Sequence, residues 1–66
     1  MPIVQIQLIE GRNGDQKEKL IKEVTDACVS ALDCKPETVR ILLSDVATQD
    51  FGVAGVSVKK KREQAS

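Results

Sequence analysis

The chain has 66 residues, with ten Lys or Arg, ten Asp or Glu and a formal net charge of zero. This balance, with Phe51 as the one aromatic residue, argues against nucleic-acid binding, which needs excess positive charge and stacking side chains. The sequence has no His and two Cys six positions apart, which argues against a zinc site, and no apolar run is long enough to cross a membrane. We therefore expect one domain over residues 1–66, in the cytoplasm, with no metal, cofactor, nucleic acid or membrane as a partner.

A chain this short buries a small share of its surface when it folds alone. Small domains compensate with disulfides, a metal or oligomerisation. The sequence starts without the basic and apolar regions of a secretion signal, and we expect Cys28 to be a core thiol. Self-association is therefore the expected source of stability.

Residues 3–9 alternate in a way that predicts a strand, with Val4, Ile6 and Leu8 on one face. Pro2 comes directly before it, a position where proline is tolerated because its missing N–H falls outside the hydrogen-bonding ladder. After a turn, Asn13 and Gln16 have the spacing of a capping box. They predict the start of a helix over about residues 14–32. Its apolar stripe comprises Leu20, Ile21, Val24, Ala27, Cys28, Ala31 and Leu32.

Pro36 disfavours a helical conformation in Lys35, so the helix is expected to end before it. A second strand is predicted over about 39–45, a Gly-interrupted hairpin over 51–58, and a polar, frayed tail over 59–66. The basic residues of this tail are expected to be solvated, with an anion-binding patch as the alternative.

Strand, helix and strand in this order predict a β-α-β unit with parallel strands and a right-handed crossover, in the α/β class. The sheet face opposite the helix mixes apolar and polar residues, among them Ile3, Ile9, Leu42 and Arg40. Such a face should pack against another subunit.

The usual acid–base groups are scarce, since His is absent and Cys28 is assigned to the core. Pro2 would have a free secondary amine once Met1 is removed, although a strand-starting role is the ordinary interpretation of this proline. Burial and a neighbouring Arg would lower the pKa of this amine from the usual α-amino range of about 7.7–8.0. A neutral amine of this kind would serve as a general base.

Two arginines are candidate substrate ligands. Arg12 follows the first strand, and Arg40 lies inside the second strand among apolar residues. A guanidinium binds a carboxylate through two parallel hydrogen bonds, and its charge stabilises an enolate. The alternative for Arg40 is a snorkelling or salt-bridged interface residue.

Together these features resemble the 4-oxalocrotonate tautomerase family. The resemblance covers about residues 2–55 and rests on the combination of several short motifs. They are Pro2-Ile3, Gln5-Ile6, Ile9-Glu10-Gly11-Arg12, Gln16-Lys17, Val39-Arg40-Ile41 and Phe51-Gly52-Val53 with Gly55. Ala54 stands where the family often has Gly.

The resemblance implies an isomerase that interconverts the enol and keto forms of a short unsaturated 2-hydroxy dicarboxylate, as in aromatic hydrocarbon catabolism. It implies that Pro2 moves the proton, that Arg12 binds the far carboxylate, and that Arg40 of a different subunit binds the near carboxylate and the 2-oxygen. Ile9 would contribute a backbone N–H through water, and Phe51 an apolar wall. It also implies dimers assembled into a hexamer of identical chains, with a heterohexamer of two related chains as an alternative.

Two other functions stay open from the sequence. One is another reaction of the superfamily, such as a dehalogenating hydratase or a decarboxylase. The apolar residues Ile9 and Val53 argue against the hydratase, since it uses charged residues near these positions. The other is a non-catalytic subunit, favoured if Met1 is retained, because an acylated proline nitrogen cannot accept a proton.

Overall fold

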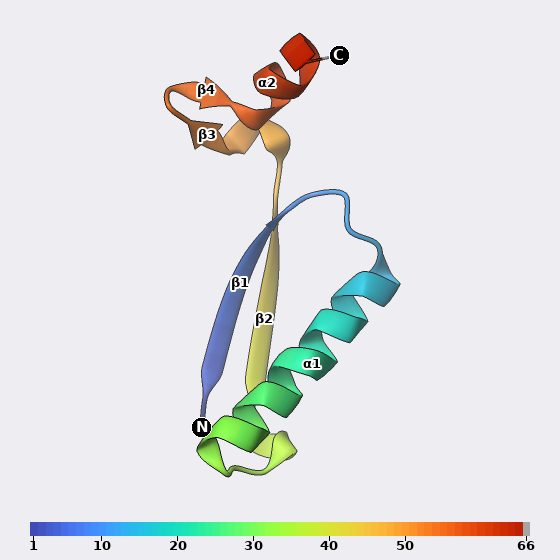
Figure 1. Cartoon of the computed structure of the whole chain (residues 1–66), viewed down its shortest axis with the longest axis vertical. Coiled ribbons are helices and arrows are strands. Elements are labelled where there is room, and N and C mark those ends of the chain that lie inside the picture. Colours follow the sequence, from blue (N-terminus) through green and yellow to red (C-terminus); the bar gives the residue numbers. More distant parts are fainter. Residues whose placement is uncertain (66) are drawn as a thin grey trace.

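The structure, a computed structural model, describes residues 1–65 (Figure 1). Its elements are β1 (Ile3–Ile9), α1 (Gly14–Leu32), β2 (Arg40–Val46), the short strands β3 (Gly52–Val53) and β4 (Val56–Ser57), and α2 (Val58–Ala65). Two 3-10 turns, η1 (Pro36–Thr38) and η2 (Thr48–Asp50), precede β2 and β3.

The core of the fold is a β-α-β unit, as the sequence predicts. β1 and β2 are parallel, in a register that runs from Ile3 opposite Arg40 to Ile9 opposite Val46. In Figure 1, α1 lies along one face of this pair. Because side chains alternate along a strand, the half-buried residues Val4, Ile6 and Leu8 share one face, whereas Ile3, Gln5 and Gln7 are exposed.

The second strand is displaced by one residue from the predicted range of 39–45. Val39 donates its backbone N–H to the carbonyl oxygen of Pro36 at 3.1 Å, which closes η1. Strand pairing therefore begins at Arg40 and continues to Val46. Val39 is the one apolar residue of the described chain that counts as buried.

The ends of α1 follow local rules. The side chain of Asn13 accepts a hydrogen bond from the Gln16 backbone at 2.8 Å, and the Gln16 side chain accepts one from the Asn13 backbone at 3.2 Å. This is the predicted capping box. The helix ends at Leu32 because Asp33 adopts a left-handed conformation (φ 53°) and Lys35, before Pro36, is extended.

The C-terminal hairpin has a two-residue turn formed by Ala54 and Gly55. Both residues have positive φ, at 54° and 81°, which is the requirement of a type I′ turn. β3 and β4 pair antiparallel on either side of it.

The tail is helical, which corrects the expectation of a frayed segment over 59–66; Ser66 lies outside the described residues. Ser57 Oγ accepts a hydrogen bond from the Lys60 backbone at 3.1 Å and caps the first turn of α2. The Lys, Arg, Glu and Gln residues that made the segment look like a solvated tail are also good helix formers.

A single chain covers little of its own apolar surface. Its radius of gyration is 15.5 Å, against about 11 Å for a compact chain of this length. Figure 1 shows why: the hairpin and α2 stand beyond the end of β2, away from the N-terminus and α1. On the sheet face opposite α1, here called the open sheet face, Ile3 is 63% exposed and Leu42 is 48% exposed. Within residues 1–65, no helix has the length and hydropathy needed to cross a membrane.

Helix α1 also presents more apolar surface than the sheet covers. Leu20, Val24 and Cys28 are half-buried, so Cys28 is not the fully buried core thiol that the sequence predicts, and Ala27, Ala31 and Leu32 are exposed. These six residues and Glu23 line a shallow apolar depression on the helix. The predicted stripe is therefore wider than the face that contacts β1 and β2, and part of it is open to a further partner.

Candidate active site

Pro2 and Arg40 lie together at the start of the parallel sheet. The backbone N–H of Arg40 donates a hydrogen bond to the carbonyl oxygen of Pro2 at 2.9 Å. This hydrogen bond extends the parallel pairing of β1 with β2, which begins with Ile3 opposite Arg40, back to Pro2. Pro2 is half-buried, although Met1 before it is exposed.

The Arg40 guanidinium is held by the turn that precedes β2. Its Nη1 donates to the carbonyl oxygens of Glu37 at 2.5 Å and Val39 at 3.5 Å. The side chain is exposed and projects from the sheet face that α1 leaves open. A positive charge there is accessible to an anionic substrate, and the two carbonyls restrict where it points.

Ile9 and Arg12 lie at the opposite end of β1. Glu10 donates its backbone N–H to Val46 across the sheet at 2.9 Å. Because successive N–H groups of a strand point to opposite sides, the N–H of Ile9 points to the other edge of β1, which has no neighbouring strand among residues 1–65. Ile9 and Arg12 line one pocket together with the turn between them.

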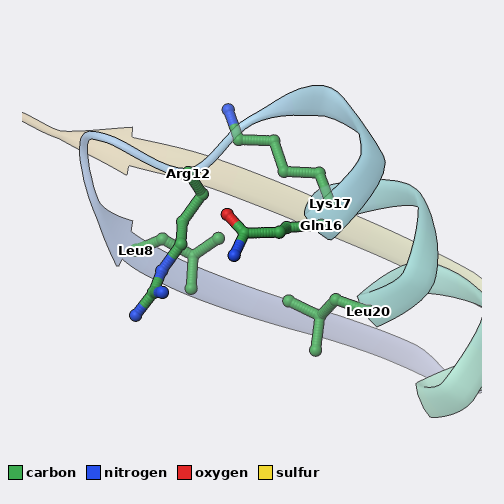
Figure 2. A pocket seen from close by; sticks show the side chains of 5 residues that line it. All are labelled: Leu8, Arg12, Gln16, Lys17 and Leu20. Atoms are coloured by element: carbon green, nitrogen blue, oxygen red, sulfur yellow. The ribbon is translucent and has the colours of Figure 1, made fainter.

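The guanidinium of Arg12 is available to a ligand. Within residues 1–65 it makes no hydrogen bond or ion pair with another side chain or carbonyl. It lines a second pocket of about 280 Å³ between β1 and the first turns of α1, together with Leu8, Gln16, Lys17 and Leu20 (Figure 2).

The predicted site residues are therefore divided between two ends of the sheet. From Ile3 to Ile9 an extended strand spans about 20 Å at about 3.3 Å per residue, so one chain does not bring Pro2 and Arg12 to a single substrate. Phe51, which is 41% exposed, comes just before β3, and β3, β4 and α2 stand beyond the end of β2 in Figure 1. The carbonyl of Phe51 accepts a hydrogen bond from Val58 at 2.7 Å, which ties α2 to the hairpin.

The structure also brings residues to the Arg12 end that the sequence did not single out for function. Gln16 was predicted as a capping residue and was part of the family resemblance without a role in binding, and Arg62 was assigned to a solvated tail. Arg62 lines the same pocket as Ile9 and Arg12. No sequence signal predicts this proximity, because it depends on how the hairpin turns α2 back toward the loop after β1.

Comparison with known proteins gives a consistent family. The family model described as "Tautomerase enzyme" matches residues 2–61. The chain is 44% identical over 62 residues to a 2-hydroxymuconate tautomerase of Pseudomonas putida, an alignment that covers 94% of this chain and 98% of that protein.

Solved structures agree. One of the 4-oxalocrotonate tautomerase isozymes from Methylibium petroleiphilum superposes with a TM-score of 0.88 at 38% identity, over 98% of this chain and 100% of that chain. A heterohexameric 4-oxalocrotonate tautomerase from Chloroflexus aurantiacus superposes with a TM-score of 0.86 at 28% identity, over 91% of this chain and 97% of that chain. Oligomeric tautomerases are thus among its structural relatives. Because a family model, sequence relatives and solved structures all match it, the chain belongs to the tautomerase family and is an isomerase.

Proposed function

We propose that this tautomerase ketonises 2-hydroxymuconate, or a closely similar dienol dicarboxylate, to 2-oxo-3-hexenedioate in the cytoplasm. The names of its relatives support the substrate class. The free thiols of Cys28 and Cys34 are compatible with the reducing conditions of that compartment.

In the proposed reaction the Pro2 amine carries one proton. Its neutral nitrogen takes the proton from the 2-hydroxyl oxygen, and the electrons of the broken O–H bond form the C2=O double bond. The C2=C3 double bond moves to C3=C4, and the electrons of the C4=C5 bond take the proton from the Pro2 ammonium at C5. Atoms and charge balance, and no cofactor takes part.

The other candidate residues bind and polarise the substrate. Arg12 binds the far carboxylate and draws electron density toward it, while Arg40 binds the near carboxylate and the 2-oxygen. The N–H of Ile9 donates through a water molecule. Phe51 contributes apolar surface that lowers the pKa of the Pro2 amine, because burial disfavours the cation.

The observation that carries this proposal is the separation of Pro2 from Ile9 and Arg12 along one open strand edge. In the part of the chain that the structure describes, β1 has β2 on one side and no strand on the other. If two copies pair their β1 edges antiparallel about a two-fold axis, the start of one strand meets the end of the other. Pro2 of each copy then lies beside the Ile9 and Arg12 positions of its partner, so these residues would come together only when two copies pair.

The exposed sheet face supports a further level of assembly. Ile3 and Leu42 stay largely exposed in one chain, and paired β1 edges would join two such faces into one. We propose that three dimers pack these faces together in a homohexamer. Arg40 projects from this face and would then reach the site of a neighbouring dimer.

The test is steady-state ketonisation of 2-hydroxymuconate, followed by ultraviolet absorbance, on protein whose intact mass shows that Met1 is absent. We expect rapid turnover with an acid limb in the pH–rate profile below the ordinary α-amine range of about 7.7–8.0. A single hexameric species in sedimentation should accompany it. Absence of turnover by hexameric chains with a free Pro2 would contradict the proposed substrate, and activity that appears only with a second type of chain would contradict the homohexamer.

A further inference from the structure

The pocket beside Arg12 has the composition of an anion site. Its five lining residues are Leu8, Arg12, Gln16, Lys17 and Leu20. None of them is acidic, and two leucines supply its apolar walls. In Figure 2 the Gln16 amide lies between the Arg12 and Leu20 side chains, over Leu8 of β1. The pocket therefore offers a cation and an amide to the same ligand group.

The capping box fixes which end of the Gln16 amide is free. Gln16 Oε1 accepts a hydrogen bond from the Asn13 backbone N–H at 3.2 Å. The atom facing an N–H donor has to be the oxygen, so the amide nitrogen is at the other end. In the view of Figure 2 this nitrogen is on the side of the Arg12 guanidinium. Within residues 1–65, Gln16 Nε2 donates to no acceptor.

Lys17, the other polar residue of the pocket, is already engaged. Its Nζ lies 2.8 Å from Oδ2 of Asp45 on β2, and Figure 2 shows its amine pointing away from the Arg12 guanidinium. The unengaged donors are therefore Arg12 and Gln16. Arg12 lies in the loop that links β1 to α1, and Gln16 lies in the first turn of α1, where the capping box holds its side chain.

We propose that Gln16 is a specificity-determining residue that donates its Nε2–H, next to Arg12, to the far carboxylate of the substrate. This inference rests on the proposed function, in which Arg12 binds that carboxylate. The capping box thus has two roles: its oxygen caps α1 and its nitrogen selects a dicarboxylate. A dienol without the far carboxylate gains nothing from Gln16.

The test compares KM for 2-hydroxymuconate with KM for 2-hydroxy-2,4-pentadienoate, the same dienol without the far carboxylate. Gln16→Glu keeps the capping acceptor, since Glu and Gln serve equally in a capping box, but removes the donor. Gln16→Met removes the donor without adding charge. A hydrogen bond to a charged group corresponds to roughly tenfold or more in affinity, so each variant should raise KM for the dicarboxylate by at least about that factor. The value of kcat and the KM for the monocarboxylate should stay within about twofold.

Asn13→Ala is the matched control for helix capping. It removes the other half of the capping box and lowers the melting temperature, yet it leaves the Gln16 amide in place. We expect it to leave the ratio of the two KM values unchanged.

Each outcome is decisive. An unchanged KM ratio in both Gln16 variants, or equal losses on both substrates, would overturn the role of Gln16 while wild-type turnover upholds the proposed function. A wild-type chain that ketonises neither compound would instead overturn the proposed function, and the Gln16 assignment with it.

Discussion

The backbone N–H of Arg40 donates to the carbonyl oxygen of Pro2 at 2.9 Å, which joins the first residue of the proposed mature chain to the second strand. The acceptor is the carbonyl of Pro2, and its nitrogen takes no part. Removal of Met1 therefore leaves this bond intact, and the freed amine stays anchored beside β2. If Pro2 acts as the proposed base, this backbone hydrogen bond helps to hold it beside β2.

The first prediction concerns the Pro2 amine. A chain with an uncleaved N-terminal tag has an acylated proline nitrogen and should lose at least about 100-fold in kcat, the lower range for general base catalysis. Pro2→Ala keeps a primary amine, so a smaller loss of about tenfold is expected. Steady-state kinetics, with intact mass as the check on each N-terminus, measure both. A tagged chain as active as the free one would rule out Pro2 as the base.

The second prediction separates the two arginines. Arg40→Ala should lower kcat/KM by about 100-fold or more, since it removes charge from the oxygen where the enolate develops. Arg12→Lys keeps the charge and loses the bidentate geometry, so about tenfold, mainly in KM, is expected. Both residues are exposed, so the thermal transition should hardly move. Wild-type kcat/KM in Arg40→Ala would contradict its assignment.

The third prediction concerns the turn between β3 and β4. Ala54 has φ 54°, a conformation that costs a residue with a Cβ about 1 kcal/mol relative to Gly. Ala54→Gly should raise the free energy of unfolding by about 0.5–1 kcal/mol per chain. Gly55→Ala, at φ 81°, should lower it. Denaturation at a fixed protein concentration compares the two, and equal effects of the same sign would show that the turn strain has been misassigned.

Local chemistry made much of this fold predictable from the sequence. The Asn13–Gln16 capping box and the alternation over 3–9 specify α1 and β1 through contacts within a few residues of each other. The first residue of β2 was harder to predict, because Val39 takes part in the turn that its N–H closes onto Pro36 and is therefore not available to the strand. The helical tail was mispredicted because a run of charged residues is compatible with both a helix and a solvated, irregular segment.

The candidate site residues were selected from the sequence one by one, and their roles stay predictions. Sequence chemistry and the family resemblance select Pro2, Arg12 and Arg40, and the predicted strand over 3–9 already separates Pro2 from Arg12. The pocket that joins Arg12 to Gln16 depends on the path of the loop between β1 and α1. The proximity of Arg62 to Ile9 depends on the hairpin. Contacts of this kind arise from tertiary packing and leave no periodic signal.

The fourth prediction tests the ion pair that links α1 to β2. Lys17 Nζ lies 2.8 Å from Asp45 Oδ2, and the two side chains are 30% and 46% exposed. Partly exposed pairs contribute about 0.2–1 kcal/mol and weaken with salt. A double-mutant cycle with Lys17→Gln and Asp45→Asn should give a coupling energy of about 0.5 kcal/mol that shrinks at high ionic strength. A coupling energy of zero at low salt would show that the pair does not stabilise the fold.

The fifth prediction links assembly to activity. Leu42 is 48% exposed on the open sheet face, where the proposed hexamer buries it. Leu42→Glu places a charge in that interface, and an unpaired buried charge is strongly unfavourable. The variant should sediment as smaller species. Its kcat/KM should fall by about 100-fold or more, because the neighbouring dimer would no longer supply Arg40 to the site.

Ser30→Glu is the control for this change, because it adds the same charge at an exposed position of α1 and should leave both sedimentation and turnover unchanged. Within one chain, Pro2 precedes β1 and Arg12 follows it, and β1 from Ile3 to Ile9 spans about 20 Å. A Leu42→Glu chain that dissociates to monomers and keeps wild-type kcat/KM would therefore contradict a site shared between copies. One that stays hexameric would show that this face is not the interface.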